Sequence, residues 1–171
     1  AVSAPPAAWG ASFAEEAAFL RKHADVIVLR DRTGEAQIAI TPAMQGRVMT
    51  STAEGADGLS FGWINRELIA SRRVQPHINV YGGEDRFWMG PEGGQYSIFF
   101  AKGVPFDLEH WYTPAAFDTA RFKAVSKKRD RVQFQYSFQL TNYSGTTFRV
   151  KVNREVQLIE PGQVLKQFSV A

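Results

Sequence analysis

The chain has 171 residues, 44% hydrophobic and 22% charged, with 20 lysines and arginines against 17 aspartates and glutamates and no cysteine. This length supports one buried core without a structural metal, and the lack of cysteine excludes disulfides, thiolate metal sites and cysteine nucleophiles. The net charge of +3 is dispersed along the sequence, so we expect no nucleic-acid partner, and no apolar run is long enough to predict a membrane partner.

The start of the chain is small, proline-containing and uncharged over residues 1–10. We expect a flexible segment there, followed by a single domain over residues 11–171. The segment lacks the basic start and apolar stretch of an intact signal peptide, which is consistent with a signal that has been removed. We therefore expect a periplasmic or extracellular protein. Ser12 and Glu15 have the spacing of a capping box, which predicts one short amphipathic helix through His23.

After this helix the hydrophobic pattern changes to that of strands. Residues 25–30 and 35–41 flank a turn-forming segment and predict a hairpin. Residues 46–52 predict a third strand and residues 59–65 a fourth. Residues 66–72 predict a helical turn.

The second half of the chain is again rich in predicted strands, at residues 96–100, 122–127, 131–141 and 146–159. In residues 131–141, apolar side chains alternate with glutamines and a serine, which predicts an antiparallel sheet with one buried face. The predicted fold class is mainly β, an antiparallel β-sandwich with one short N-terminal helix.

A long glycine-rich loop, residues 76–95, carries the most chemistry. Between its two glycine pairs lie Glu84, Asp85, Arg86, Trp88 and Glu92. An aromatic ring can stack on the apolar face of a sugar, while carboxylates and a guanidinium bond to its hydroxyls. The loop therefore predicts a cleft that binds carbohydrate.

Two alternatives to a sugar site remain open for this loop. Its charged residues can form a local ion-pair and turn network, with Trp88 plugging one end of the sandwich. Glu84, Asp85 and Glu92 also carry oxygen ligands suited to calcium. However, the sequence has no recognised metal or nucleotide motif, so we expect no metal and no cofactor.

Three tryptophans lie beside loops rich in glycine or proline, at Trp63, Trp88 and Trp111. We expect at least one of them to form a stacking platform for a ligand, although core packing is the alternative for each.

Three strings carry a family resemblance: YGGEDRFWMGPEGGQYSIFF at residues 81–100, QGRVMTS at 45–51 and FGWIN at 61–65. They resemble an uncharacterised, commonly exported bacterial family of the galactose mutarotase-like superfamily. The resemblance implies an antiparallel supersandwich that binds carbohydrate, of which this chain resembles only the first part.

The resemblance also implies a second function, that of a sugar-processing enzyme of the aldose 1-epimerase or polysaccharide lyase-like type. Such epimerases use a histidine acid, a glutamate base and an early arginine. His77 is the corresponding candidate for the acid. The resemblance nominates no base; on chemical grounds Glu84 is the catalytic candidate, with Asp85 and Glu92 as alternatives, and Arg47 joins Asp85 and Arg86 as a sugar contact. Trp88 and Glu92 complete the candidate binding residues. The base of those epimerases lies late in the chain, so the resemblance favours a binding module and leaves catalysis open.

An incomplete sandwich would expose sheet edges and an apolar face. We therefore expect either self-association into a homo-oligomer or covering by a further C-terminal segment.

Overall fold

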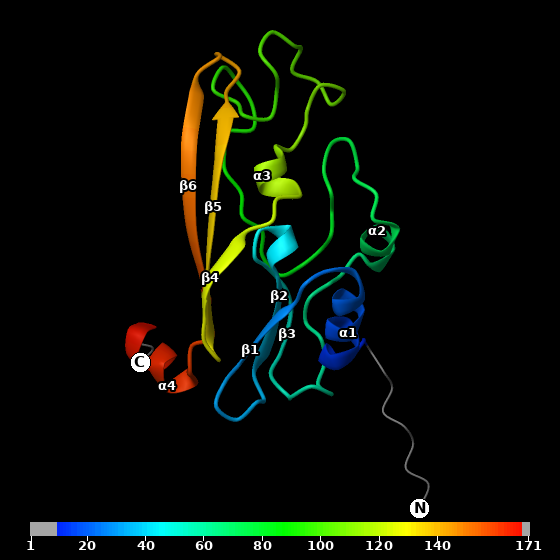
Figure 1. Ribbon diagram of the computed structural model, residues 1–171, viewed down its shortest axis with the longest axis vertical. Helices are drawn as coiled ribbons and strands as arrows, with labels where there is room; N and C mark the ends of the chain where they lie inside the picture. The colour runs from blue at the N-terminus through cyan, green and yellow to red at the C-terminus, as the bar shows by residue number, and fades with distance from the viewer. Residues whose placement is uncertain (1–9, 169–171) are drawn as a thin grey trace, which may run out of the picture.

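The computed structural model describes residues 10–168 of the chain. Its strands form two three-stranded antiparallel sheets, ordered β1-β2-β3 and β4-β5-β6 (Figure 1). The prediction of a mainly β, antiparallel fold is confirmed. The predicted flexible segment, residues 1–10, lies outside the described residues except for Gly10, as do residues 169–171.

The first sheet contains the predicted hairpin and third strand, as β1 (Ile27–Arg30), β2 (Gln37–Thr41) and β3 (Arg47–Thr52). Asp31 closes the turn between β1 and β2 because its carboxylate accepts a hydrogen bond from the main-chain N–H of Gly34 at 2.6 Å. Every residue of β2 is buried, so this central strand has both faces covered.

The second sheet contains β4 (Lys123–Lys127), β5 (Arg131–Thr141) and β6 (Thr147–Gln157). The predicted alternation in β5 is confirmed, since Val132 and Phe134 are buried while their neighbours face solvent. β5 and β6 pair along their whole length, and their hairpin extends beyond the first sheet (Figure 1).

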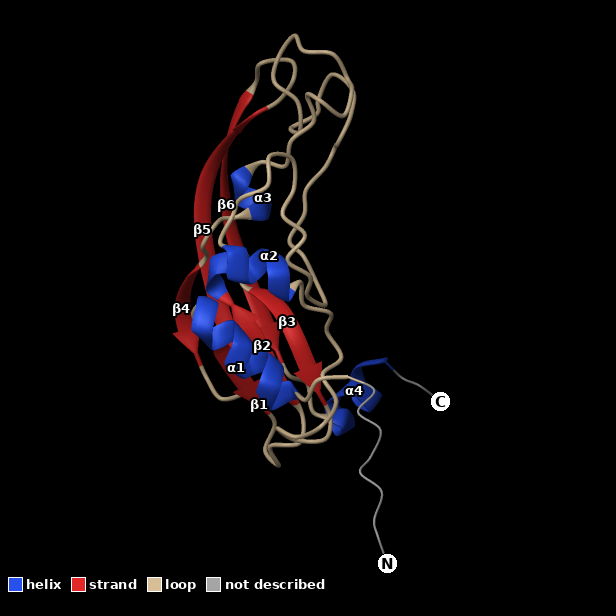
Figure 2. Ribbon diagram, turned by 90° about the vertical axis from the view of Figure 1, so that its right-hand side faces the viewer, coloured by secondary structure: helices blue, strands red, loops and turns tan. Residues whose placement is uncertain are grey.

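The two sheets share a cluster of buried side chains. It consists of Leu29, Ile38, Ile40, Ala120, Phe122, Val132 and Phe134. The other face of the first sheet is covered by α1 (Phe13–His23), which lies across it in Figure 2. Phe13, Ala17 and Leu20 of α1 pack there against Ala39 and other residues of the first half of the chain. These two layers place the core on both sides of the first sheet.

The capping box predicted for α1 is confirmed. The main-chain N–H of Ser12 donates to Glu15 Oε2 at 2.8 Å, and the N–H of Glu15 donates to Ser12 Oγ at 3.2 Å. The helical turn predicted after residue 65 is α2 (Arg66–Ser71). Two further short helices, α3 (Ala115–Asp118) and α4 (Pro161–Phe168), were not predicted. Across residues 10–168, no helix is both long and apolar enough to cross a membrane.

Two predicted strands are wrong. Residues 59–65 run close to β3 but make only isolated bridges, one of which joins Ile64 to Gly82. Residues 96–100 form turns and bends. Their apolar side chains pack instead in a third cluster, where Phe99 contacts the ring of Phe117 against the far half of the β5–β6 hairpin.

The outer edge of β6 is open. Hydrogen bonds from Asn142 N to Thr146 O and from Leu158 N to Asp130 O mark bonded pairs at the two ends of the hairpin. Because bonded pairs alternate in an antiparallel ladder, the even-numbered residues of β6 bond to β5 and the odd-numbered ones direct their main-chain groups outward. These outward groups have no main-chain partner within the described part of the chain.

Candidate functional site

A strap formed by residues 82–87 lies along the edge of β3. The N–H of Gly83 donates to Trp63 O at 2.8 Å, and the N–H of Glu84 donates to Val48 O at 2.9 Å. The Asp85 carboxylate in turn accepts the N–H of Val48 at 2.8 Å. The strap therefore satisfies polar groups that β3 would otherwise expose at its edge.

The glycine pair at the start of the strap allows this close approach. Gly82 has φ +87°, and a Cβ there would lie 2.2 Å from the carbonyl oxygen of Trp63. At Gly83, with φ +105°, a Cβ would lie 2.7 Å from Cδ of Arg47. These glycines therefore bring the strap against the chain's own backbone. In contrast, Gly93 and Gly94 have open space around the position of a Cβ.

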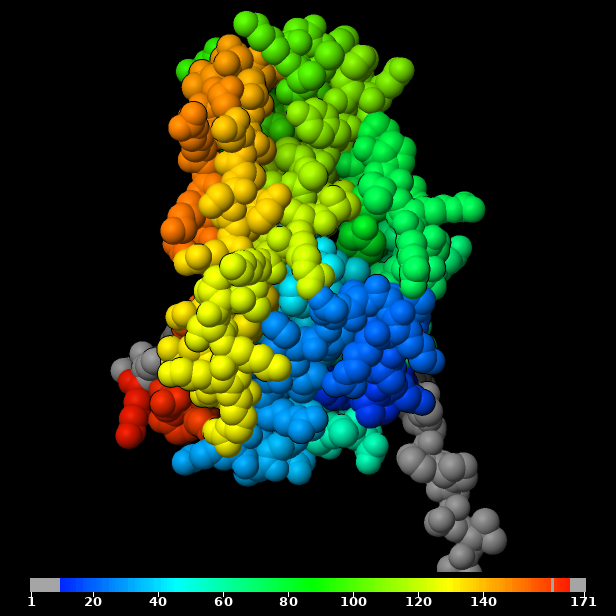
Figure 3. Space-filling model, in the orientation of Figure 1, coloured from blue at the N-terminus to red at the C-terminus, as the bar shows by residue number. Residues whose placement is uncertain are grey.

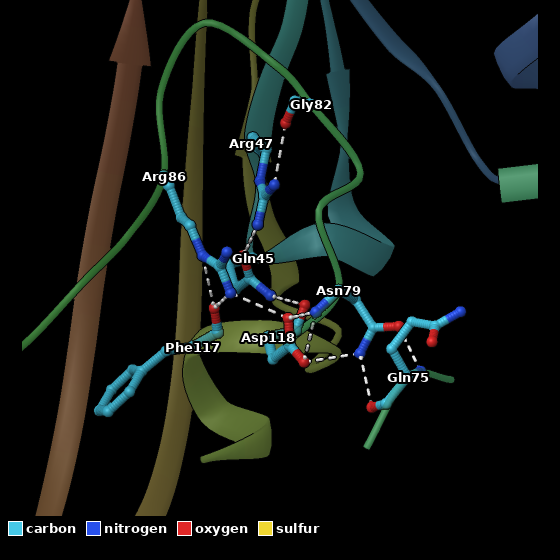
Figure 4. A network of polar contacts seen from close by, with 8 residues as sticks. All are labelled: Gln45, Arg47, Gln75, Asn79, Gly82, Arg86, Phe117 and Asp118. Carbon is cyan, nitrogen blue, oxygen red and sulfur yellow. Dashed lines mark hydrogen bonds and ion pairs between the residues drawn. The ribbon is translucent and has the colours of Figure 1, made fainter. Parts of the chain in front are cut away.

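Arg47 is the most deeply buried of the predicted sugar contacts, at 2% exposure. Its Nη1 donates to Gly82 O at 2.9 Å and its Nη2 to Gln45 Oε1 at 2.7 Å (Figure 4). Its buried Nε has no hydrogen-bond partner among residues 10–168. Burial, together with the nearby charge of Arg86, lowers the pKa of Arg47 to about 10. The buried Arg47 side chain therefore holds the start of the strap, at Gly82, against β3.

Asp118, at the end of α3, is the centre of this polar network (Figure 4). Its carboxylate, 4% exposed, accepts the main-chain N–H of Asn79 at 3.0 Å and its Nδ2 at 2.7 Å. Arg86 Nη2 donates to the same carboxylate at 2.8 Å and to Phe117 O at 3.0 Å. Burial is the main cause that lowers the pKa of Arg86. Asp118 could not be predicted from sequence, because its side-chain partners lie more than thirty positions away.

Asp85 links the strap to the second sheet. Its carboxylate pairs with the guanidinium of Arg154 on β6, whose Nε also donates to Gly46 O at 3.1 Å. Arg154 was not predicted, since it is one of three basic residues of β6 and nothing in the sequence distinguishes it from the other two. The predicted contacts Asp85 and Arg86 thus lie in the strap and Arg47 lies on the adjoining strand β3, and each makes bonds within the protein.

Trp88 lies beside this network. The Arg86 guanidinium stacks over its ring at 4.6 Å, and the ring also packs against Phe99 at 5.1 Å between centroids. Its Nε1 donates to Glu92 Oε1 at 2.7 Å. The structure brings the predicted Trp88 and Glu92 together, with the indole half-buried and in contact with the core.

His77 and Glu84, the predicted acid and base, have separate partners. His77 Nδ1 lies 2.6 Å from Trp111 O, and both carboxylate oxygens of Glu84 accept from Ser51 Oγ, at 2.8 and 2.9 Å. Within residues 10–168 no hydrogen bond joins these two side chains. Nor do three or more His, Asp or Glu side chains gather into a metal-binding group there.

Of the three tryptophans proposed as platforms, Trp63 is the most exposed, at 62%. Phe61, two residues earlier, is 57% exposed. Their backbone is held against β3, because the N–H of Gly62 donates to Thr50 Oγ1 at 3.1 Å and that of Phe61 to Ser51 O at 3.0 Å.

A cavity of about 390 Å³ lies between α2 and the first part of the predicted loop. It is lined by Asn65, Glu67, Leu68, Ser71, Arg73, Gln75, Ile78 and Val80. The main-chain N–H groups of Arg73 and Gln75 are bonded, to Ser71 Oγ at 3.2 Å and Asn79 Oδ1 at 2.8 Å. By contrast, the exposed side chains of Glu67, Arg73 and Gln75 make no hydrogen bond or ion pair with the rest of the described chain.

In this cavity, a ligand would therefore contact polar side chains that have no hydrogen-bond partner within the described part of the protein. Sequence reasoning missed Glu67, Arg73 and Gln75, because exposed polar residues beside a short helix follow no recognisable motif. The one available signal was the pair of polar residues, Arg73 and Gln75, in the short segment between the helical turn and the glycine-rich loop.

No curated protein and no solved structure matches this chain. A family model does match, over residues 11–171, and it is described as a family of unknown function, DUF6786. The match spans nearly the whole chain, so the protein belongs to the DUF6786 family.

Proposed function

We propose that this protein binds a carbohydrate in the cavity between α2 and residues 73–80. The observation that supports this most directly is the lining of that cavity. Its volume of about 390 Å³ falls in the range typical of small-ligand sites. The lining combines apolar side chains with a carboxylate, a guanidinium, amides and a hydroxyl.

These groups match the two surfaces of a sugar. A carboxylate such as that of Glu67 accepts two or more hydroxyl bonds, and the guanidinium of Arg73 donates in a planar fork. Gln75 can do both with one amide. Ile78 and Val80 offer an apolar wall to the C–H face of the ring. The binding residues proposed here differ from the predicted ones, which make their bonds within the protein.

The buried polar network has a positioning role in this proposal. Asp118 holds the main chain and amide of Asn79, and Asn79 Oδ1 accepts the N–H of Gln75 (Figure 4). On the opposite wall, Asn65 caps α2 by accepting the N–H of Leu68 at 3.1 Å, and its Nδ2 donates to Val80 O at 3.0 Å. Both walls are thereby fixed before a ligand arrives, which reduces the entropy lost on binding.

The resemblance to the galactose mutarotase-like superfamily supports the same class of ligand. It also supports export to the periplasm or cell surface, where polysaccharide fragments occur. Both remain part of the proposal, since the family to which the chain belongs has no described function.

Calorimetric titration with a panel of mono- and disaccharides tests the proposal. We expect Arg73→Ala and Glu67→Gln each to weaken binding by about tenfold to a hundredfold, the loss typical of a hydrogen bond to a charged group. Arg149→Ala and Glu109→Gln, which alter exposed residues remote from the cavity lining, should bind as the wild type does. If no saccharide binds, or if all four variants bind equally, the proposal fails.

The same samples distinguish binding from catalysis. Anomer interconversion of several aldoses, followed by NMR, should proceed at its uncatalysed rate if the protein only binds sugar. Acceleration that is lost in His77→Ala would instead assign the protein to the sugar-processing class.

A further inference from the structure

A second hollow, of about 540 Å³, lies on another part of the molecule. It is formed where the end of α1, the strand β1 and the β4–β5 turn meet, and in Figure 3 the yellow turn lies against the blue N-terminal part of the chain. Arg21, Arg30, Lys127, Lys128 and Arg129 line it. Val26 and Val28 supply the remaining lining. We call it the basic cleft.

The charges of the basic cleft are not neutralised within the protein. Across residues 10–168, none of its five cationic side chains takes part in an ion pair. Arg30 Nε donates only to a neutral group, Gln37 Oε1, at 3.1 Å. Five of the lining side chains thus carry positive charge while the whole chain has a net charge of only +3. Such a cluster focuses a positive potential on the hollow.

The cleft is also held in shape by the main chain. The N–H of Arg30 donates to Arg129 O at 2.9 Å, and the N–H of Lys128 donates to Arg131 O at 2.7 Å. The first bond ties the β4–β5 turn to β1 and the second closes the turn, so that Arg30 and Arg129, 99 positions apart, present their charges to one space.

We propose that the basic cleft binds the sulfate or carboxylate groups of an acidic polysaccharide. Guanidinium groups bind such oxyanions through paired hydrogen bonds, and several cations in one hollow favour a ligand that carries several anionic groups. The two valines form an apolar floor that suits the C–H surface of a sugar ring. The choice of a sugar as the carrier of these groups rests on the proposed function.

A nucleic acid is the competing polyanion, and the lining argues against it. Proteins that bind single strands commonly stack bases on aromatic side chains. The lining of the basic cleft contains no aromatic residue. Apart from the end of α1, the cleft is formed by a hairpin turn and a short strand, whereas proteins that read a duplex place a whole helix or a two-stranded ribbon in its groove.

Four probes of equal length distinguish these ligands: a sulfated oligosaccharide, an oligogalacturonate, a neutral oligosaccharide and a single-stranded oligonucleotide. Binding is measured by calorimetry at several salt concentrations. The double variant Lys128→Ala with Arg129→Ala removes two exposed cations of the cleft and keeps its main-chain bonds. The matched control, Arg149→Ala with Lys151→Ala, removes two exposed cations from the solvent face of β6.

We expect a sulfated or uronic oligosaccharide to bind, with an affinity that falls as salt rises. The cleft variant should lose about tenfold or more of that affinity, while the control variant keeps it. An equal loss in both variants would show that net charge alone attracts the ligand, which overturns the proposal. Tighter binding of the oligonucleotide would also overturn it.

The outcomes separate this inference from the proposed function. If acidic oligosaccharides fail to bind while a neutral saccharide still depends on Arg73, only the basic cleft is refuted. If acidic oligosaccharides bind through Lys128 and Arg129 while Arg73→Ala has no effect on any sugar, the cleft stands and the α2 cavity is refuted.

Discussion

The strap gives the sharpest test of the structure, through a pair of glycine-to-alanine substitutions. Gly82 and Gly94 both have positive φ, +87° and +79°, so alanine should cost about 1 to 2 kcal/mol of backbone strain at either site. At Gly94 nothing lies within 4 Å of the new Cβ, whereas at Gly82 the Trp63 carbonyl oxygen would lie 2.2 Å away. Only Gly82→Ala therefore meets a backbone contact that must move.

The extra cost at Gly82 has two sources. Overpacking costs about 1 to 3 kcal/mol. Displacing the strap also strains the hydrogen bonds from Gly83 to Trp63 O and from Glu84 to Val48 O, each contributing about 1 kcal/mol. We expect Gly82→Ala to lower the free energy of unfolding by about 2 to 4 kcal/mol more than Gly94→Ala does.

Urea denaturation followed by circular dichroism measures this difference directly. For a chain of this size the melting temperatures should differ by about 5 to 15 °C. Equal free energies of unfolding for the two variants would refute the placement of the strap against Trp63 and β3.

Two further predictions concern the polar network and the open sheet edge. Asp118→Asn should lower the free energy of unfolding by about 3 kcal/mol, because the partly buried guanidinium of Arg86 loses its charged partner. Asp107→Asn, in an exposed pair with His110, should cost less than about 1 kcal/mol. Equal midpoints in urea for the two variants would contradict the network. We also predict that two copies of the protein associate through the open edges of their β6 strands. An antiparallel pair of β6 strands related by a two-fold axis at Val152 would place Arg149 of one copy opposite Glu155 of the other, and such opposite charges stabilise a strand pair. Sedimentation should show a dimer that Arg149→Glu weakens, and a monomer at high concentration would contradict this pairing.

Local patterns in the sequence were sufficient to predict much of the fold. The alternation of residues 131–141, the hairpin turns and the Ser12–Glu15 capping box depend on nearby residues, and each is present in the structure. Residues 59–65 also alternate, but their exposed side chains Phe61 and Trp63 mark a segment that lies on β3 without joining a ladder. Alternation alone does not report whether a neighbouring strand is available to pair with the segment.

The contacts of the predicted site residues were harder to predict from sequence, because their partners are far away along the chain. Asp85 meets Arg154 and Arg86 meets Asp118 across 69 and 32 positions. The alternative interpretation of Glu84, Asp85 and Arg86 as an internal ion-pair network describes the last two well, although their partners are remote rather than local. The glycine pair at 82 and 83 is a place of close approach, and at Gly82 the group that approaches is a carbonyl of the protein itself.

The most direct measurement of the central claim is a crystal structure of the protein soaked with the neutral saccharides that titrate. The account predicts electron density for a sugar between α2 and residues 73–80, with hydroxyls within hydrogen-bonding distance of Glu67 and Arg73. Density for the same sugar elsewhere, with that cavity empty, would contradict it.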